Sequence, residues 1–469
     1  MRSRTILSIL LFLSAMVAVA HPSHREKIPY PSEKCYIFQV MLKDKNGTPF
    51  TLDKPSAYLS QRALERRARQ GLKVDSTDLP VSPVYLKRLS RYDISIVGVS
   101  KWNNAVLVSG TDLQQLVRLV KVPFVKSVKQ VWVSPDSVYE PEGREVVHED
   151  FRKWDSVPGK FFGAANEQTK MLHAQALHTR GYDGKGFVIA VLDGGFMNVD
   201  KIPAFASVNI LGTHDFVVGS RQNVYREMDH GTKVLSTMAL NQPEVFRGTA
   251  PGASYWLLRC EDGASEYPVE EFYWAEAAEF ADSVGADIIS SSLGYHAYDD
   301  PTASYKYADQ DGKTALISRT ASLLAGKGIV LVNSAGNDGR DTWKKINFPA
   351  DASNILSVGA VSLNGLNAPF SSIGPTADGR IKPDVMAPGC PDAVVGGRGT
   401  IVYCNGTSFA APLISGMVAC LWQAFPKKTA LQIMDMVRKL GNNASTPDNI
   451  FGYGIPNFEK VFETANQQK

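Results

Sequence analysis

Residues 187–195 read Phe-Val-Ile-Ala-Val-Leu-Asp-Gly-Gly, an unbroken apolar run that ends in a carboxylate and two glycines. Such a run is typical of a strand in a parallel sheet that is buried on both faces. Further short apolar runs lie at residues 255–260, 288–293, 329–333 and 355–361. Helical patterns lie between and after them, at residues 269–284, 315–325, 408–424 and 430–440. The pattern predicts an α/β domain with a mostly parallel central sheet and helices on both faces.

A smaller block precedes this domain and is large enough to fold as a unit. It carries strand patterns at residues 36–42, 94–99, 105–108 and 125–133 and helical patterns at residues 57–70 and 112–120. Two strand–helix–strand halves predict a small α+β domain. The first helix holds four basic residues, Arg62, Arg66, Arg67 and Arg69. We predict that they form a solvated helix face, with binding to an acidic partner as the alternative.

The N-terminus and the connection between the blocks define the rest of the domain organisation. Residues 1–20 hold two arginines, an apolar run and Ala18-Val19-Ala20, the pattern of a secretory signal peptide. A membrane span is the alternative, but it needs about 20 apolar residues. We therefore predict an exported protein, extracellular or periplasmic, with no membrane span after the signal is removed. The other predicted parts are the α+β domain at 21–134, a linker with a processing site at 135–165, and the α/β domain at 166–469.

Composition excludes one class of function and leaves the cysteines partly open. The chain has 50 basic and 47 acidic residues, a net charge of +3, which gives no support for nucleic-acid binding. Its five cysteines are an odd number, so at least one is unpaired. Cys390 and Cys404 flank a glycine-rich loop and are the predicted disulfide pair. Cys420 lies in an apolar helical pattern and is predicted to be a buried free thiol.

Ligands bind at the carboxyl ends of the strands in such a sheet, so reactive side chains are expected there. Asp193 ends the first apolar run, although an Asp before two glycines is also typical of a turn. His230 lies in Asp-His-Gly-Thr at 229–232, near a helix start, and a lone histidine is more often structural. Ser408 lies in Asn-Gly-Thr-Ser-Phe-Ala-Ala-Pro at 405–412, where it is also a candidate helix N-cap.

Together these three residue types form a known catalytic set. A serine hydroxyl is a poor nucleophile until a base removes its proton, and histidine supplies such a base near neutral pH. A carboxylate fixes the histidine tautomer and stabilises the imidazolium that forms. The order Asp193, His230, Ser408 is one of the orders in which this triad occurs.

These segments resemble the active-site signatures of the subtilisin-like serine proteases. Residues 406–412 follow the family pattern almost residue by residue, and residues 229–232 follow it well. The sequence departs from the pattern at three places: Gly194, where the family usually has Ser or Thr, Lys233, and Leu235-Ser236. The resemblance spans about residues 166–465, and it makes residues 166–469 the catalytic domain.

The resemblance implies roles for further residues. Asn337, in Asn-Ser-Ala-Gly-Asn-Asp at 333–338, would donate its amide to the oxyanion together with the Ser408 backbone N–H; a left-handed turn residue is the alternative. Ser292, Leu293 and Gly294 resemble the substrate-binding strand, whose backbone pairs with an extended peptide. The upstream block resembles the propeptide that serves as an intramolecular inhibitor.

The function implied is that of a secreted serine endopeptidase acting on protein or peptide substrates through an acyl-enzyme. No cofactor or catalytic metal is required. Calcium is common in the family as a structural ion, and the sequence shows no defined ligand loop for it. A non-catalytic secreted peptide-binding protein on the same fold is the alternative. An esterase or lipase is disfavoured, because it needs a G-x-S-x-G elbow and the order Ser, acid, His.

Overall fold

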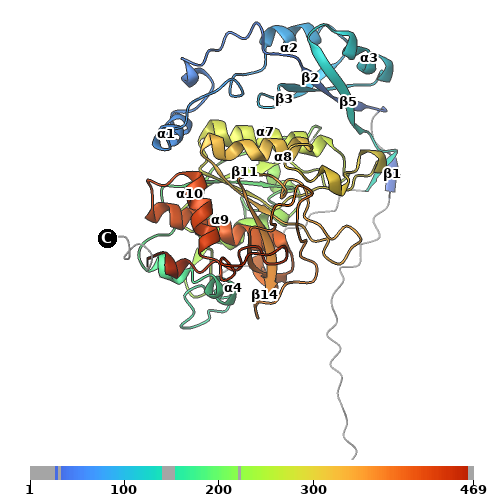
Figure 1. Ribbon diagram of the computed structural model, residues 1–469. Helices are drawn as coiled ribbons and strands as arrows, with labels where there is room; N and C mark the ends of the chain where they lie inside the picture. Colours follow the sequence, from blue (N-terminus) through green and yellow to red (C-terminus); the bar gives the residue numbers. More distant parts are fainter. Residues whose placement is uncertain (1–26, 30–32, 140–153, 220–222, 463–469) are drawn as a thin grey trace, which may run out of the picture.

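The computed structural model of the 469-residue chain describes residues 27–29, 33–139, 154–219 and 223–462. The chain forms a smaller α+β unit, blue to cyan, and a larger α/β unit beneath it (Figure 1). The predicted signal peptide and the middle of the predicted linker lie outside the described residues.

The centre of the larger unit is a seven-stranded sheet in which all neighbouring strands are parallel, in the order β15-β14-β13-β12-β7-β11-β8. This confirms the predicted α/β fold class. The chain passes from β7 to the edge strand β8, returns to β11, and then continues with β12 on the other side of β7. The strand order therefore reverses at β7, where open parallel sheets bind ligands. The strands are β7 (Val188–Asp193), β8 (Asn209–Asp215), β11 (Ser254–Arg259), β12 (Ile288–Ser291), β13 (Val330–Ser334), β14 (Leu356–Ser362) and β15 (Val385–Cys390).

The central strand β7 shows why helices cover both faces of the sheet. All six of its residues are buried, and successive side chains point to opposite faces. Ile189 and Val191 join the core beneath α6, α9 and α10, whereas Ala190 and Leu192 join the core beneath α7 and α8. The helices of the unit are α4 (Asn166–Met171), α5 (Gln175–His178), α6 (His230–Ala239), α7 (Val269–Val284), α8 (Leu316–Leu323), α9 (Thr407–Ala424) and α10 (Ala430–Lys439).

Helix α9, with 18 residues, is the longest helix of the larger unit as the structure describes it, and it is strongly apolar. Among the described residues it is the one helix long and apolar enough to cross a membrane, and 83% of that window is buried inside the protein. Its apolar surface is thus accounted for by the core under the sheet. Short antiparallel pairs complete the unit: β9 (Asn241–Gln242) with β10 (Phe246–Arg247), and β16 (Asp392–Val395) with β17 (Ile401–Cys404).

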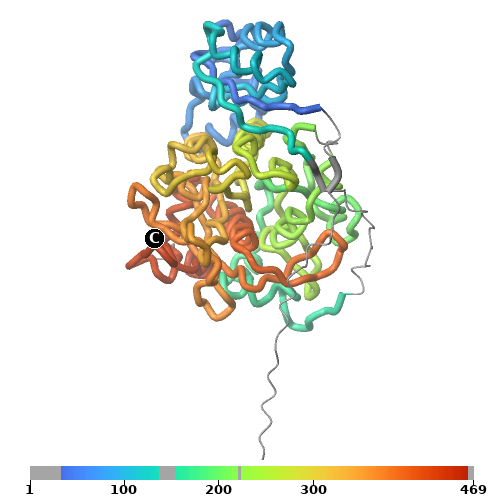
Figure 2. Tube along the Cα trace, turned by 90° about the vertical axis from the view of Figure 1, so that its right-hand side faces the viewer, coloured from blue at the N-terminus to red at the C-terminus, as the bar shows by residue number. Residues whose placement is uncertain are grey.

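The smaller unit is an antiparallel sheet in the order β3-β4-β2-β5, with helices on one face. Phe38 and Val40 of β2 face its own core, whereas Ile37 joins the core formed with α7 and α8. The sheet therefore rests on these two helices, and Figure 2 shows the blue unit seated on the yellow segment. Its elements are β1 (Lys27–Pro29), β2 (Tyr36–Leu42), α1 (Gln61–Arg69), α2 (Pro83–Leu89), β3 (Ser95–Ser100), β4 (Ala105–Gly110), α3 (Leu113–Arg118), β5 (Val125–Val133) and β6 (Ser137–Tyr139), with β1 paired to β6.

The prediction of a solvated helix face is wrong for two of the four arginines of α1, whereas the side chains of Arg62 and Arg69 are 40% and 48% exposed. Arg66 and Arg67 are only 1% and 2% exposed, and both pair with Asp282 at the end of α7. Arg62 and Arg69 pair with Asp287, which is fully buried. The alternative, an acidic partner, describes the structure, and the partner belongs to the same chain.

The predicted disulfide is also absent. Both Cys390 and Cys404 are free thiols in the structure. The β16–β17 hairpin sets Asp392, rather than Cys390, opposite Cys404. Cys420 is a fully buried free thiol in α9, as predicted.

Candidate active site

Ser408 is the second residue of α9 and is 8% exposed. It is not the N-cap, because the cap residue is Gly406 and no side chain caps this helix. Pro412 lacks the N–H that would normally bond to the Ser408 carbonyl four residues earlier. Ser292 Oγ donates to that carbonyl instead, at 2.8 Å, and Ser408 Oγ donates to the Ser292 carbonyl at 3.3 Å. The two segments are therefore locked together beside the serine hydroxyl.

His230 begins α6 and contacts the carboxylate at the end of β7. Its Nδ1 lies 2.9 Å from Asp193 Oδ1 and 3.0 Å from Asp193 Oδ2. The close approach depends on Gly231, because a Cβ at this position would lie 2.4 Å from the Gly195 carbonyl oxygen. Asp193 Oδ1 also accepts from the Gly194 N–H at 2.8 Å. The carboxylate therefore forms a turn-like contact and also orients the imidazole.

The charges around the site raise the pKa values of His230 and of the nearby Glu261. Burial lowers the pKa of His230, but the charge and hydrogen bond of Asp193, aided by Glu261, outweigh it and raise the pKa to about 9. Burial and the charge of Asp193 also raise the pKa of Glu261, to about 7, against the lowering effect of His230. The imidazole thus sits in a strongly negative field.

A pocket of about 340 Å³ brings together six of the seven predicted site residues. Asp193, the seventh, is fully buried behind His230. The lining consists of Met228, His230, Glu261, Ser292, Leu293, Gly294, Ser334, Gly336, Asn337, Asp338, Asn347 and Ser408.

The side chain of Asn337 has a defined orientation at the pocket edge. Its Oδ1 accepts from the Thr407 N–H and from the Thr407 hydroxyl, both at 3.0 Å. A backbone N–H can only donate, so the amide oxygen must face Thr407, and Nδ2 is left to donate to a ligand. Asn337 is not a left-handed turn residue; Gly336 holds that conformation, with φ of 112°.

Residues 292–294 continue the chain beyond β12 and form one wall of the pocket. The Leu293 carbonyl accepts from Asn333 Nδ2 at 3.1 Å, which fixes the wall to β13. A Cβ at Gly294 would lie 3.0 Å from Asn347 Cβ, so the missing side chain makes room for Asn347.

Six lining residues were not among the predicted site residues: Met228, Glu261, Ser334, Gly336, Asp338 and Asn347. Glu261 follows the carboxyl end of β11, which lies beside β7. Its place after an apolar strand pattern was therefore a sequence signal that could have predicted it. Met228 explains one departure from the family pattern, since a Cβ at Gly194 would lie 2.9 Å from its sulfur. A hydroxyl residue at position 194 would require Met228 to move.

The other two departures have structural partners. Lys233 Nζ lies 2.8 Å from Asp229 Oδ1, within the first turns of α6. Ser236 Oγ accepts from the Val395 N–H at 2.9 Å and so fastens α6 to the β16–β17 hairpin.

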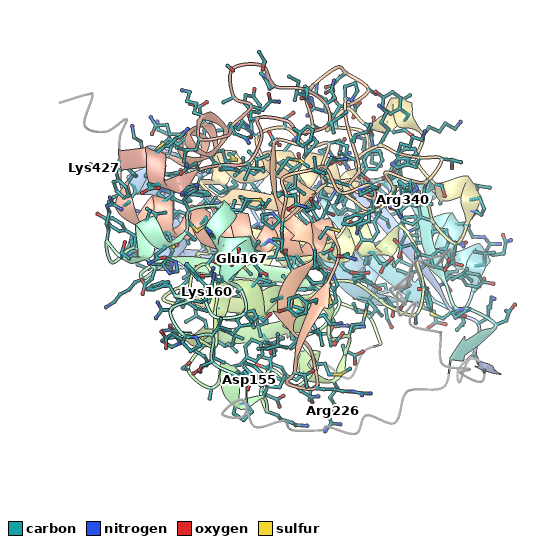
Figure 3. The ribbon with its side chains drawn as sticks, turned by 90° about the horizontal axis from the view of Figure 1, so that it is seen from below. Asp155, Lys160, Glu167, Arg226, Arg340 and Lys427 are labelled. Carbon is teal, nitrogen blue, oxygen red and sulfur yellow. The ribbon has the colours of Figure 1, made fainter. Side chains whose placement is uncertain are left out.

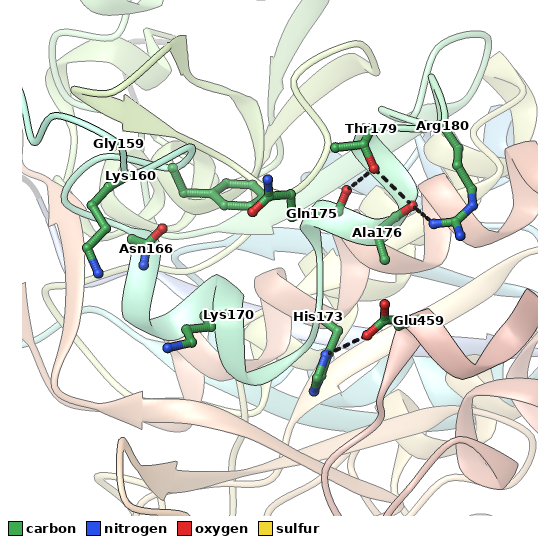
Figure 4. Close-up of a pocket in the computed structure, with 11 residues that line it drawn as sticks. Gly159, Lys160, Asn166, Lys170, His173, Gln175, Ala176, Thr179, Arg180 and Glu459 are labelled. Carbon is green, nitrogen blue, oxygen red and sulfur yellow. Dashed lines mark hydrogen bonds and ion pairs between the residues drawn. The ribbon is translucent and has the colours of Figure 1, made fainter.

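A second, larger pocket of about 500 Å³ contains none of the predicted site residues (Figure 4). Several of its charged side chains already have partners: His173 lies 3.1 Å from Glu459, a contact drawn in Figure 4, and Lys160 lies 3.1 Å from Glu167. Figure 3 labels Lys160 and Glu167 in the view from below. It therefore offers no nucleophile–base pair. Across the described ranges, no group of three or more His, Cys, Asp or Glu side chains is placed to hold a metal ion.

Comparison with known proteins agrees with the geometry. The sequence model of the Subtilase family, peptidase S8, matches residues 184–454, more than half of the chain. The chain belongs to the subtilase family. A second model, the peptidase S8 propeptide domain of Bacteroidota, matches residues 38–143. This subtilase is thus a serine endopeptidase that carries a propeptide domain, which is the smaller unit.

Individual relatives cover most of this subtilase. Subtilisin NAT of Bacillus subtilis subsp. natto is 31% identical over 333 residues, which are 70% of this chain and 76% of the relative. Subtilisin of Bacillus pumilus is 31% identical over 287 residues, 60% of this chain and 92% of the relative. The crystal structure of MycP1 from the ESX-1 type VII secretion system has a similar fold, with a TM-score of 0.50 and 23% identity; it covers 68% of this chain and 90% of MycP1.

Proposed function

We propose that this subtilase is a secreted enzyme that hydrolyses peptide bonds through Asp193, His230 and Ser408. The observation that carries the proposal is the contact of His230 Nδ1 with the Asp193 carboxylate, in a pocket that also holds the Ser408 hydroxyl. The alternative, a non-catalytic peptide-binding protein, has no need for a histidine oriented by a carboxylate in the same pocket as a serine.

The first half of the reaction forms the acyl-enzyme. Ser408 Oγ attacks the peptide carbonyl carbon as His230 Nε2 takes its proton. The carbonyl π electrons move to oxygen, and the new oxyanion is held by Asn337 Nδ2 and the Ser408 backbone N–H. The C–N bond then breaks, and His230 gives its proton to the departing amine. Asp193 stabilises the imidazolium throughout.

The second half returns the free enzyme. His230 removes a proton from water as its oxygen attacks the acyl carbon, and the Ser408 Oγ–C bond breaks with proton return to Ser408. Residues Ser292, Leu293 and Gly294 would pair with the substrate backbone as an added strand. The chemistry needs no cofactor or metal; a structural calcium ion stays a prediction.

The propeptide domain is proposed to act as an intramolecular inhibitor. Its last long strand, β5, brings Trp132 to the loop after β11, where Trp132 Nε1 lies 3.4 Å from Ser265 Oγ. Glu261 of the pocket lies in the same loop, four residues before Ser265, and this supports a path of the segment after β5 toward the active site. The signal-like N-terminus supports export. The burial of α9 supports a mature chain without a membrane span.

Self-processing tests the proposal in the full chain. Incubation of the purified precursor should give a shortened chain by intact mass, with a new N-terminus within the predicted linker at 135–165. Ser408→Ala should stay full length. Ser415→Ala is the matched control: Ser415 lies in the same helix, is fully buried, and bonds to Ser290 Oγ at 2.8 Å, outside the pocket. Equal processing of the Ser408→Ala chain would contradict the proposal.

A further inference from the structure

Helix α1 of the propeptide contacts the larger unit far from the pocket. Arg62 and Arg69 of this helix pair with Asp287. The backbone N–H of Asp287 donates to the Val188 carbonyl at 2.9 Å, and its carboxylate accepts from the Val188 N–H at 3.1 Å. Val188 begins β7, whereas Asp193 of the proposed triad ends it. Because a strand rises about 3.3 Å per residue, the two ends of β7 lie roughly 17 Å apart, and α1 binds at the edge of the sheet opposite the active site.

The carboxyl end of α7 binds two arginines of α1 through its backbone. Arg62 Nε donates to the Gly285 carbonyl at 2.9 Å. Arg66 Nη1 donates to the Ala286 carbonyl at 2.6 Å, and both carbonyls directly follow the last residue of α7. The carbonyls at the end of a helix carry partial negative charge, which favours cations there. The guanidinium groups are therefore bound by backbone oxygens as well as by carboxylates.

Ion pairs cross this contact in both directions. The larger unit supplies Asp282, whose Oδ2 lies 3.0 Å from Arg67 Nη2 of the propeptide. The propeptide in turn supplies Asp75 and Asp78, and each has a carboxylate oxygen 3.0 Å from Lys327 Nζ of the larger unit. Lys327 is only 2% exposed, so this pair is buried by the contact itself. Complementary charges of this two-way kind fix the register of one surface on the other.

Two glycines and a glutamine complete the contact without charge. A Cβ at Gly285 would lie 2.7 Å from Arg62 Cβ, and one at Gly328 would lie 2.7 Å from Gln70 Nε2. Gln70 follows the last residue of α1, and its Nε2 donates to the Gly328 carbonyl at 2.8 Å. Its Oε1 accepts at 2.7 Å from the N–H of Ala430, the first residue of α10. The surface of the larger unit is therefore shaped for this helix as well as charged for it.

We propose that the larger unit carries a docking site for an arginine-bearing helix, separate from the active site, and that α1 of the propeptide is its occupant. The site, called the α1 site below, consists of Asp282, Asp287, Lys327 and the carbonyls beside them. The proposal rests on the proposed function only in that a cut in the linker separates the two units. After that cut, the α1 site keeps the propeptide attached even when the propeptide segment near the pocket has left it.

The test follows the propeptide after an imposed cut. A recognition sequence for an added site-specific protease is placed in the linker of the Ser408→Ala precursor, so that neither catalysis nor self-digestion contributes. The precursor is immobilised through its larger unit, the cut is confirmed by intact mass, and loss of the propeptide is measured over time. Raising the salt from about 0.1 M to about 1 M should speed this loss on the order of tenfold, because screening weakens the half-exposed ion pairs.

Two variants separate the charged from the uncharged contacts. Arg62→Gln combined with Arg69→Gln removes both partners of Asp287 and should release the propeptide on the order of 10- to 100-fold faster, with a weaker effect of salt. Gln70→Ala removes two hydrogen bonds and should speed release by about fivefold or more, with the salt effect retained. Because the two variants change different contacts, Gln70→Ala carries the test if the double arginine variant fails to fold.

Arg88→Gln combined with Arg91→Gln is the matched control. Both arginines are exposed residues of the propeptide, and neither is among those that pair with the larger unit in the described structure. This variant should release the propeptide at the unchanged rate. Equal release from the control and from both α1 variants, without an effect of salt, would overturn the α1 site. That result would leave the proposed function standing, because the assay involves no catalysis; failure of the proposed function shows instead as equal self-processing of the Ser408→Ala chain.

Discussion

Two acidic regions of this subtilase differ in whether arginine or lysine side chains form ion pairs with their carboxylates. At the end of α7, Asp282 and Asp287 are fully buried, and arginines of the propeptide helix α1 pair with both. In the pocket, Glu261 and Asp338 form no ion pair among the described residues, although the charges of Glu261 and His230 act on each other. The first region is complete within one chain and marks an internal interface. The second lines the proposed active site and has no such pairing among the described residues.

Asp193 sharpens the comparison, because this carboxylate, buried behind the pocket, does contact a basic side chain, that of His230. Asp193→Asn removes the charge that stabilises the imidazolium, so we expect the rate of propeptide cleavage to fall by about 10⁴. Time-resolved intact mass measures that rate. Asp392→Asn is the control, a fully buried carboxylate whose two oxygens have no hydrogen-bond partner in the described structure. A rate for Asp193→Asn within tenfold of the unchanged protein would break the account.

Asp282 tests the paired region. Asp282→Asn leaves Arg66 buried and unpaired, so the precursor should lose about 3–5 kcal/mol of unfolding free energy. Urea titration of the Ser408→Ala precursor, which cannot process itself, measures this loss. Asp435→Asn breaks an exposed pair with Lys439 and should cost no more than about 0.5 kcal/mol. Equal losses in the two variants would mean that the interface charges are not coupled as described.

Glu276 makes the interface sensitive to pH. Burial raises its pKa to about 8, although the Val99 N–H, which donates at 2.6 Å, favours the charged form. The raised pKa means that the folded precursor prefers the protonated acid. This stability is present below about pH 4.5, the unfolded value, and is lost as pH rises through about 8.

The precursor should therefore lose roughly 1–3 kcal/mol between pH 5 and pH 8 from this group, with partial exposure reducing the full linkage value. Urea midpoints of the Ser408→Ala precursor across this range measure the trend. Glu276→Gln should flatten it, because the amide does not titrate. A slope that the substitution leaves unchanged would assign the pH effect to other groups.

Replacement of Glu261 should have the smallest of these effects, a shift in the pH dependence of activity. The proposed base form of His230 accumulates as pH rises through about 9, so activity should increase over that range. Glu261 contributes to the raised pKa, and its removal should lower it. With a peptide that carries no charged side chain, Glu261→Gln should move the rising limb to lower pH by less than about 1 unit. A limb that stays in place or moves to higher pH would contradict this role.

Sequence patterns predicted the buried elements well. The bounds of β2, β5 and α7 match the predicted ranges. Their apolar residues recur with strand or helix periodicity because they pack against buried faces. The edge strand β8 was not predicted, since none of its residues is buried and it contains Gly212. Strand β15 was not predicted from the sequence, because Pro388 and Gly389 disrupt its strand pattern.

The residues of the site, too, could be predicted from the sequence only where a local motif marks them. Asp193, His230 and Ser408 lie in local motifs that can be read along the chain, and the structure brings them to one region. Asp338 and Asn347 gain their meaning only from each other and from the pocket around them. Arg66 was assigned to a solvated face because its partner Asp282 lies 216 residues further along the chain. Local patterns carry no information on such distant pairs.

Fluorophosphonate labelling of the processed enzyme, followed by peptide mapping, tests the central claim most directly. The account predicts one adduct, on Ser408, that is absent from Ser408→Ala and present in Ser415→Ala. Prior replacement of His230 by alanine should slow labelling strongly, because the hydroxyl then lacks its base. An adduct on another residue, or no adduct after confirmed removal of the propeptide, would contradict the assignment of Ser408 as the nucleophile.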